Sequence, residues 1–170
     1  MTFDAVVQSH FPGASRLRPF VRRSAVSLIQ DHGFTPANTL ACVGVCRDEI
    51  CRSLTEEVEA IWGESFDLSS LAGILTVGKT GFSAAQSHAP VVGGRRRYVF
   101  FLFAHIGVSS EGELGVTQRV GQSRPTAACG ALVALQDDLQ RGGSHAKVEW
   151  EDPEMSLLRL RMRRVQDLGP

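Results

Sequence analysis

The chain has 170 residues, in which 18 Lys and Arg balance 18 Asp and Glu, and 43% of the residues are hydrophobic. This composition excludes a disordered chain, and a net charge of zero gives no electrostatic reason to expect a nucleic-acid partner. A chain of this length normally buries one core of its own, so we expect a single domain over residues 1–170.

Membrane and secretory segments are not expected. The longest apolar runs, Leu71 to Val77 and Val99 to Ala104, are far shorter than the roughly 20 residues that cross a bilayer. The first residues lack the basic and apolar parts of a signal peptide, so we expect a cytoplasmic protein that does not bind membranes. Its four cysteines then suggest metal ligands or buried thiols rather than disulfides.

The first elements alternate between helix and strand. Apolar residues at helical spacing predict a helix over residues 15–32, which ends at Gly33. The short apolar run 40–46 predicts a buried strand, and a second helical pattern follows at once over residues 50–61. Residues 66–90 fit neither period and receive no assignment.

The second half continues the alternation. The aromatic run 98–104 predicts a buried strand, and a turn at 109–113 leads to a more polar strand near residues 114–120. Helices are predicted over residues 127–139 and 153–165, although residues 158–162 also alternate as a strand would. Interleaved strands and helices predict an α/β domain with a central, largely parallel sheet flanked by helices.

Three potential metal ligands fall at the ends of these elements. Cys46 ends the first strand, His105 ends the aromatic strand, and Cys129 lies in the first turn of the helix after Pro125. Two thiolates and one imidazole make a zinc site with an open fourth position, if the three side chains converge. The alternative is a set of inert buried cysteines and a core histidine. Cys42 and Cys51 are predicted to be packing residues.

Two other sequence patterns are weaker evidence for a functional site. Residues 73–80 match the phosphate-loop pattern GxxxxGK[ST], but bulky residues lie between its glycines and no clear strand precedes it, so a structural loop is favoured over nucleotide hydrolysis. The run 95–97 of three arginines is typical of a solvated turn, with an anion-binding patch as the alternative.

Four motifs occur in the order that is found in a known family. They are Cys46-Arg47-Asp48-Glu49; residues 78–82 with Ala84-Ala85 and His88-Ala89-Pro90; the Phe-rich strand that ends in His105-Ile106-Gly107; and residues 128–132 around Cys129. Together they resemble the limiting-CO2-inducible protein B/C family, a group related to the β-carbonic anhydrases, over about Leu17 to Leu160.

The resemblance implies a β-carbonic anhydrase-like fold and a zinc ion held by Cys46, His105 and Cys129. It also implies interconversion of CO2 and bicarbonate by attack of zinc-bound hydroxide on CO2, as part of a carbon concentrating mechanism. A homodimer is the expected assembly.

Asp48 would be the catalytic carboxylate by the same resemblance. It lies two residues after Cys46, as in the Cys-x-Asp-Ser-Arg motif of β-carbonic anhydrases, and it would either orient the attacking hydroxide or occupy the fourth zinc position. Ile50 replaces the arginine of that motif, so the partner of Asp48 is sought in Arg97, Arg52 or Arg47. The missing arginine leaves a second interpretation, a catalytically silent zinc-binding subunit in inorganic-carbon handling.

Overall fold

The computed structural model describes residues 3–141 and 148–167. The chain divides into two compact units. The sheet unit comprises residues 13–105, and the helical unit comprises residues 106–170 together with residues 1–12. The expectation of one domain over the whole chain stays a prediction. Within the described ranges, every helix is too short or too polar to span a bilayer.

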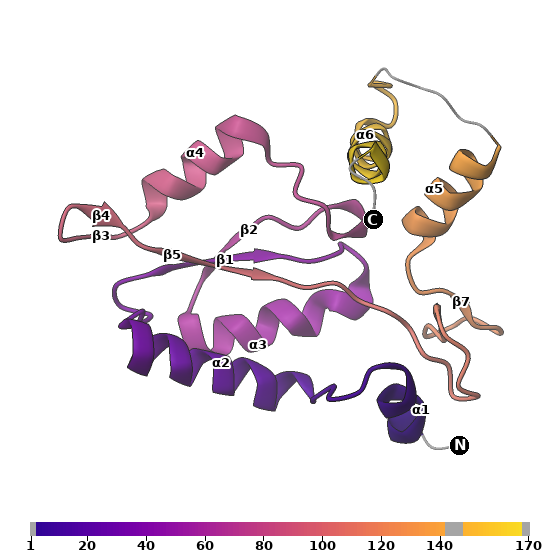
Figure 1. The fold of residues 1–170 in the computed structure, drawn as a ribbon, viewed down its shortest axis with the longest axis horizontal. Coiled ribbons are helices and arrows are strands. Elements are labelled where there is room, and N and C mark those ends of the chain that lie inside the picture. The colour runs from indigo at the N-terminus through magenta and orange to yellow at the C-terminus, as the bar shows by residue number, and fades with distance from the viewer. Residues whose placement is uncertain (1–2, 142–147, 168–170) are drawn as a thin grey trace. The chain divides into compact units, whose positions relative to one another are not determined.

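The sheet unit contains the parallel sheet that the sequence predicts. β1 (Leu40–Gly44) is its central strand, with β2 (Ser65–Asp67) on one side and β5 (Tyr98–Leu102) on the other (Figure 1). Both neighbours run parallel to β1, and β5 is in register with it from Leu40 opposite Tyr98 to Gly44 opposite Leu102. The carboxyl ends of all three strands therefore lie at one edge of the sheet.

Helices cover both faces of this sheet. α2 (Leu17–His32) and α3 (Arg52–Trp62) lie on one face, and α4 (Gly78–His88) lies on the other (Figure 1). The α4 side is filled by a cluster around Cys42, Leu68 and Ala85, and the α3 side includes a tilted ring contact of 5.9 Å between Trp62 and Phe101. The α/β architecture predicted from the sequence is thus confirmed.

The C-terminal end of α2 follows the predicted signal. Gly33 has a φ of 65°, a left-handed conformation, and its amide donates to the carbonyl of Ile29 at 3.1 Å. The next amide, that of Phe34, donates to Leu28 at 3.0 Å, so two otherwise unpaired helix carbonyls are satisfied. Glycine is needed here because it adopts this conformation without strain.

The unassigned stretch contains several short elements. β2 is followed by a 3-10 helix (Leu71–Gly73) and then by α4, and a hairpin of β3 (Val91–Val92) and β4 (Arg95–Arg96) leads into β5. Apart from α4, none of these elements is long enough to give a clear hydrophobic period. α4 is longer, but Ala85 is its only buried residue, so it has no clear apolar stripe.

The helical unit contains α1 (Phe3–His10), a small antiparallel ladder, and two C-terminal helices. The ladder joins β6 (Val116–Thr117) to β7 (Thr126–Ala127), and α5 (Gly130–Gln140) and α6 (Pro153–Asp167) follow. The predicted strand near 114–120 is therefore only two residues long, and α6 confirms the helical interpretation of its segment.

α5 and α6 pack on each other. Leu135 and Leu158 are 2% and 1% exposed, and Arg159 Nε lies 2.8 Å from Asp138 Oδ2. Leu135 of α5 and Leu158 of α6 are thus core residues of the helical unit.

Candidate metal centre

Cys46 is fixed just beyond the end of the central strand. It is 5% exposed, and it forms a parallel bridge with Ser70, which follows β2. Backbone hydrogen bonds on both sides of Cys46 hold this bridge, because the Ser70 amide donates to Val45 and the Arg47 amide donates to Ser70. The backbone at Cys46 is therefore held by ladder bonds rather than lying in a free loop.

The loop after Ser70 packs closely on this backbone. Ala72 and Gly73 are both left-handed, with φ of 56° and 70°. A Cβ on Gly73 would lie 3.3 Å from the Cys46 nitrogen, so a side chain there would crowd the backbone next to the thiol. Left-handed alanine costs free energy, and such conformations persist where the surrounding structure holds them.

This packing explains the pattern that imitates a phosphate loop. Gly73 is its first glycine, and it lies against Cys46 instead of cradling a ligand. Leu75 and Val77, which lie between the two glycines, pack against the core cluster of Cys42. The sequence pattern is therefore satisfied by core packing, and Lys79 is exposed at the start of α4.

His105 follows the neighbouring strand. The Phe103 amide donates to the Gly44 carbonyl at 3.1 Å, which holds the end of β5 against β1. Both ring nitrogens of His105 are buried, and neither has a hydrogen-bond partner in the part of the chain that the structure describes. Burying an unpaired polar atom costs about 1–3 kcal/mol. This imidazole is therefore suited to bind a group that accepts a nitrogen lone pair, such as a metal ion.

Cys129 is positioned by the small ladder of the helical unit. It directly precedes α5, where the positive end of the helix dipole stabilises negative charge such as that of a thiolate. Arg119 holds the segment before it, because its Nη1 donates to Thr126 Oγ1 at 2.6 Å and to the Ala127 carbonyl at 3.1 Å. Arg119 is a positioning residue that the sequence analysis did not identify.

Gly107 ties the same ladder to the segment that follows His105. Its carbonyl accepts from the Gly115 amide at 2.8 Å, and a Cβ on it would lie 2.3 Å from the Val116 oxygen and 2.7 Å from Ala128 Cβ. Only glycine fits this contact. His105 lies two residues before Gly107, and Cys129 lies one residue after Ala128. The contact between Gly107 and Ala128 therefore brings the segment after His105 close to the segment before Cys129.

The three predicted ligands form one group. Cys46, His105 and Cys129 each offer one ligand atom, and these atoms all lie within 4.8 Å of one another. Two sulfurs and one imidazole nitrogen are a donor set that zinc prefers, and three protein ligands leave a fourth position for water or substrate. The unpartnered nitrogens of His105 fit this use. The geometry is therefore compatible with a metal ion.

Asp48 lies in the turn after Cys46. Its Oδ1 accepts the Ile50 amide at 3.2 Å and so caps a 3-10 helix (Glu49–Cys51) that leads into α3. This bond fixes one carboxylate oxygen at the helix start. The side chain is half-buried.

Two of the candidate arginines, Arg97 and Arg52, contact other groups. Arg97 precedes the start of β5, roughly 20 Å along the strand direction from the level of Cys46. Its Nη2 donates to the carbonyls of His32 and Gly33 at the end of α2. Arg52 has a side chain that is 82% exposed, and its Nε lies 2.9 Å from Glu56 Oε1. We therefore leave both arginines out of the proposed site.

The two remaining cysteines are core residues, as predicted. Cys42 and Cys51 are both 1% exposed. Burial raises the pKa of the Cys42 thiol, because the charged thiolate is disfavoured away from water. Cys42 therefore stays protonated and packs as a small apolar side chain.

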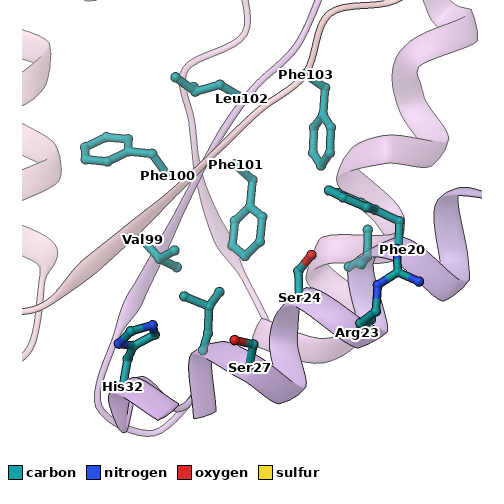
Figure 2. A pocket seen from close by; sticks show the side chains of 12 residues that line it. Phe20, Arg23, Ser24, Ser27, His32, Val99, Phe100, Phe101, Leu102 and Phe103 are labelled. Carbon is teal, nitrogen blue, oxygen red and sulfur yellow. The ribbon is translucent and has the colours of Figure 1, made fainter. Parts of the chain in front are cut away.

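A cavity of about 520 Å³ lies between α2 and β5 (Figure 2). Phe101 and Phe103 point from the strand toward α2, whereas Phe100 points away from it (Figure 2). Cys46, His105 and Asp48 are not among the residues that line this cavity, so it is separate from the metal-ligand group.

Comparison with known proteins identifies the family of the chain. The family model of the limiting CO2-inducible proteins B/C beta carbonic anhydrases matches residues 16–168. The chain is similar to the crystal structure of PtLCIB4, a homolog of the limiting CO2-inducible protein LCIB, with 27% identity, a TM-score of 0.80, and coverage of 96% of this chain and 67% of that chain.

The crystal structure of LCIB itself is 35% identical, with a TM-score of 0.72 and coverage of 95% of this chain and 65% of that one. The chain thus spans about two thirds of the length of these solved chains. A search of curated proteins gave no match. The match over most of the sequence shows that the chain belongs to the limiting CO2-inducible protein B/C family of β-carbonic anhydrases.

Proposed function

We propose that this protein is a zinc-dependent carbonic anhydrase that interconverts CO2 and bicarbonate. The observation that carries the proposal is the His105 imidazole, whose two buried nitrogens lack hydrogen-bond partners among the described residues while the Cys46 and Cys129 thiols lie within reach of one metal ion. Membership of the family supports the choice of reaction.

Each proposed ligand has a defined task. Cys46 and Cys129 would supply two sulfur ligands, and His105 would supply one nitrogen. Zinc with three protein ligands supplies an open position and lowers the pKa of a water bound there toward about 7, which is the chemistry that CO2 hydration needs. Val45, which is 4% exposed beside Cys46, would help to keep the site dry for an apolar substrate.

Asp48 would accept a proton or a hydrogen bond from the attacking water. One of its oxygens accepts a hydrogen bond from the Ile50 amide, and this bond orients the carboxylate. We propose this role for Asp48 without an arginine partner from Arg97 or Arg52.

A second candidate function has an observation in its favour. β-Carbonic anhydrases pair this aspartate with an arginine, and here Ile50 stands in the motif position while Arg97 and Arg52 contact other groups. A catalytically silent zinc-binding subunit that assists inorganic-carbon handling is therefore the alternative.

Stopped-flow CO2 hydration separates the two functions. Zinc-loaded protein should accelerate hydration above the buffer rate, and the metal-free protein should not. A zinc-loaded sample that gives no acceleration from mildly acid to alkaline pH would support the silent subunit and reject the enzyme. Zinc content has to be measured on the same sample, so that failure of loading is recognised.

We further propose a cytoplasmic homodimer, on the basis of the family resemblance. Light scattering coupled to size-exclusion chromatography tests the assembly, with a dimer mass near 37 kDa expected from a chain of 18.4 kDa. A monomeric mass at micromolar concentration would contradict it.

A further inference from the structure

We propose that a second site on the sheet unit binds a phosphorylated small molecule. The site is an open cavity of about 450 Å³, here called the arginine cavity, at the end of the sheet opposite to Cys46. Its volume lies within the range of small-molecule sites. It is lined by His32, Phe34, Val92, Arg95, Arg96, Arg97 and Tyr98.

A tight hairpin builds one wall of the cavity. β3 and β4 pair Val92 with Arg95, and the two residues between them, Gly93 and Gly94, have φ of 57° and 76°. Two consecutive left-handed residues are typical of the type I′ turn that fits hairpins. The Arg97 amide then donates to the Pro90 carbonyl at 2.9 Å, so the backbone of the arginine run is held in register.

Arg97 forms a rigid part of the cavity. Its guanidinium lies over the Phe34 ring at 4.3 Å from the centroid, and its Nη2 donates to the carbonyls of Gly33 at 2.7 Å and His32 at 3.2 Å. Its Nε is buried, and it has no hydrogen-bond partner among the described residues. A stacked guanidinium with a spare buried donor is already oriented, so a bound anion would cost little side-chain entropy.

The charge of the cavity is uncompensated. Its lining contains three arginines and one histidine but no carboxylate. Arg95 and Arg96 are exposed, and neither makes an ion pair within the described residues. Guanidinium groups bind phosphate through paired, charge-assisted hydrogen bonds, which makes a phosphate group the best-matched anion.

The aromatic residues indicate the rest of the ligand. Phe34 and Tyr98 line the same cavity, and Tyr98 is 36% exposed. Aromatic and apolar surface beside the arginines offers contact to an organic group attached to the phosphate. This combination favours a phosphate ester over a free inorganic ion.

The proposal can be tested by isothermal titration calorimetry on the full chain. The probes are inorganic phosphate and AMP, at about 0.15 M salt, where long-range attraction between exposed charges is screened. We expect saturable binding with one AMP per chain, and tighter binding of AMP than of phosphate. The measurement needs neither zinc nor CO2, so its outcome is independent of the carbonic anhydrase proposal.

Matched variants locate the binding. The double variant Arg95→Gln/Arg96→Gln should weaken AMP binding at least about tenfold, because it removes two charge-assisted contacts. The control Arg22→Gln/Arg23→Gln removes the same charge from exposed positions of α2 and should change the affinity less than about twofold. Arg95→Lys/Arg96→Lys keeps the charge but loses the paired donors, and it should give an intermediate affinity.

Three results would overturn the proposal. They are the absence of saturable AMP binding to the wild-type chain, an equal loss of affinity in the two glutamine variants, and equal affinities for AMP and inorganic phosphate. Thermal melting of each variant confirms that it is folded, and the lysine variant provides the comparison if the glutamine variant is not.

Discussion

The Phe103 amide donates a hydrogen bond of 3.1 Å to the Gly44 carbonyl, and this bond joins the ends of the two strands that carry proposed ligands. Cys46 lies two residues beyond Gly44, and His105 lies two residues beyond Phe103. Parallel strands in register therefore bring a thiol and an imidazole to the same edge of the sheet, where sites of open α/β sheets form.

Replacing single cysteines should distinguish ligand from packing residue. Cys46 and Cys42 are both buried, at 5% and 1% exposure, in or next to the same strand. Cys46→Ala should lose most of the zinc, whereas Cys42→Ala should keep it and lose about 1–2 kcal/mol of unfolding free energy. Zinc per chain after dialysis, measured by mass spectrometry, checks the prediction. Full zinc occupancy in Cys46→Ala would contradict it.

Removing the His105 imidazole should cost more stability when metal is present than when it is absent. We expect His105→Ala to lower zinc content and CO2 hydration together. In the metal-free protein the same change should cost less stability, since the ring nitrogens have no described hydrogen-bond partners to lose. Thermal melting with and without a chelator measures both states. If chelation destabilises wild type and His105→Ala equally, His105 is not a ligand.

Variants of Asp48 can separate its cap on the Ile50 amide from the catalytic role that we propose for it. Asp48→Asn keeps an oxygen that can cap the Ile50 amide, so stability and zinc content should hold while CO2 hydration falls at least about a hundredfold, as expected for a lost general base. Asp48→Ala should in addition lose about 1 kcal/mol of unfolding free energy with the cap. Activity of Asp48→Asn within threefold of wild type would remove Asp48 from the reaction.

Gly107 should not tolerate a side chain. A Cβ there would clash with the Val116 oxygen and with Ala128 Cβ, so Gly107→Ala should lower the unfolding free energy by about 1–3 kcal/mol or more and weaken zinc binding. Gly130→Ala is the control, because its Cβ would meet nothing within 4 Å. Urea unfolding and chelator competition measure the two effects. Equal stability of the two variants would argue against the close contact.

The ion pair between α2 and α3 predicts a pH dependence of stability. Arg18 donates to Glu57 and holds the pKa of this carboxyl below its ordinary value. A folded-state pKa that is lowered adds stability above the ordinary glutamate pKa, and this stability is lost as the pH falls through the lowered pKa. Glu57→Gln should therefore make the unfolding free energy less dependent on pH on the acid side.

Acid titration of unfolding, followed by circular dichroism, compares Glu57→Gln with wild type. The Arg18 side chain is 67% exposed, so the difference should be small and should shrink in high salt. Identical curves for the two proteins at low salt would show that the pair contributes nothing to stability.

The sequence predicted the elements whose signals are local. The apolar period of α2 with its terminal glycine, the buried runs of β1 and β5, and the helix after Cys46 all follow from neighbouring residues. The position of each potential ligand at an element end could be predicted for the same reason. The short ladder of β6 and β7 could not, because two-residue strands are fixed by their partners rather than by periodicity.

The pairing of distant segments was decided only by the tertiary structure. Sequence alone proposed that Cys46, His105 and Cys129 could converge, and the fold brings their ligand atoms within 4.8 Å. Sequence also offered Arg97 as a partner of Asp48, but strand register places it at the far end of β5, against the end of α2. Local chemistry sets which side chains are available, whereas hydrogen-bond register and close packing set which of them meet.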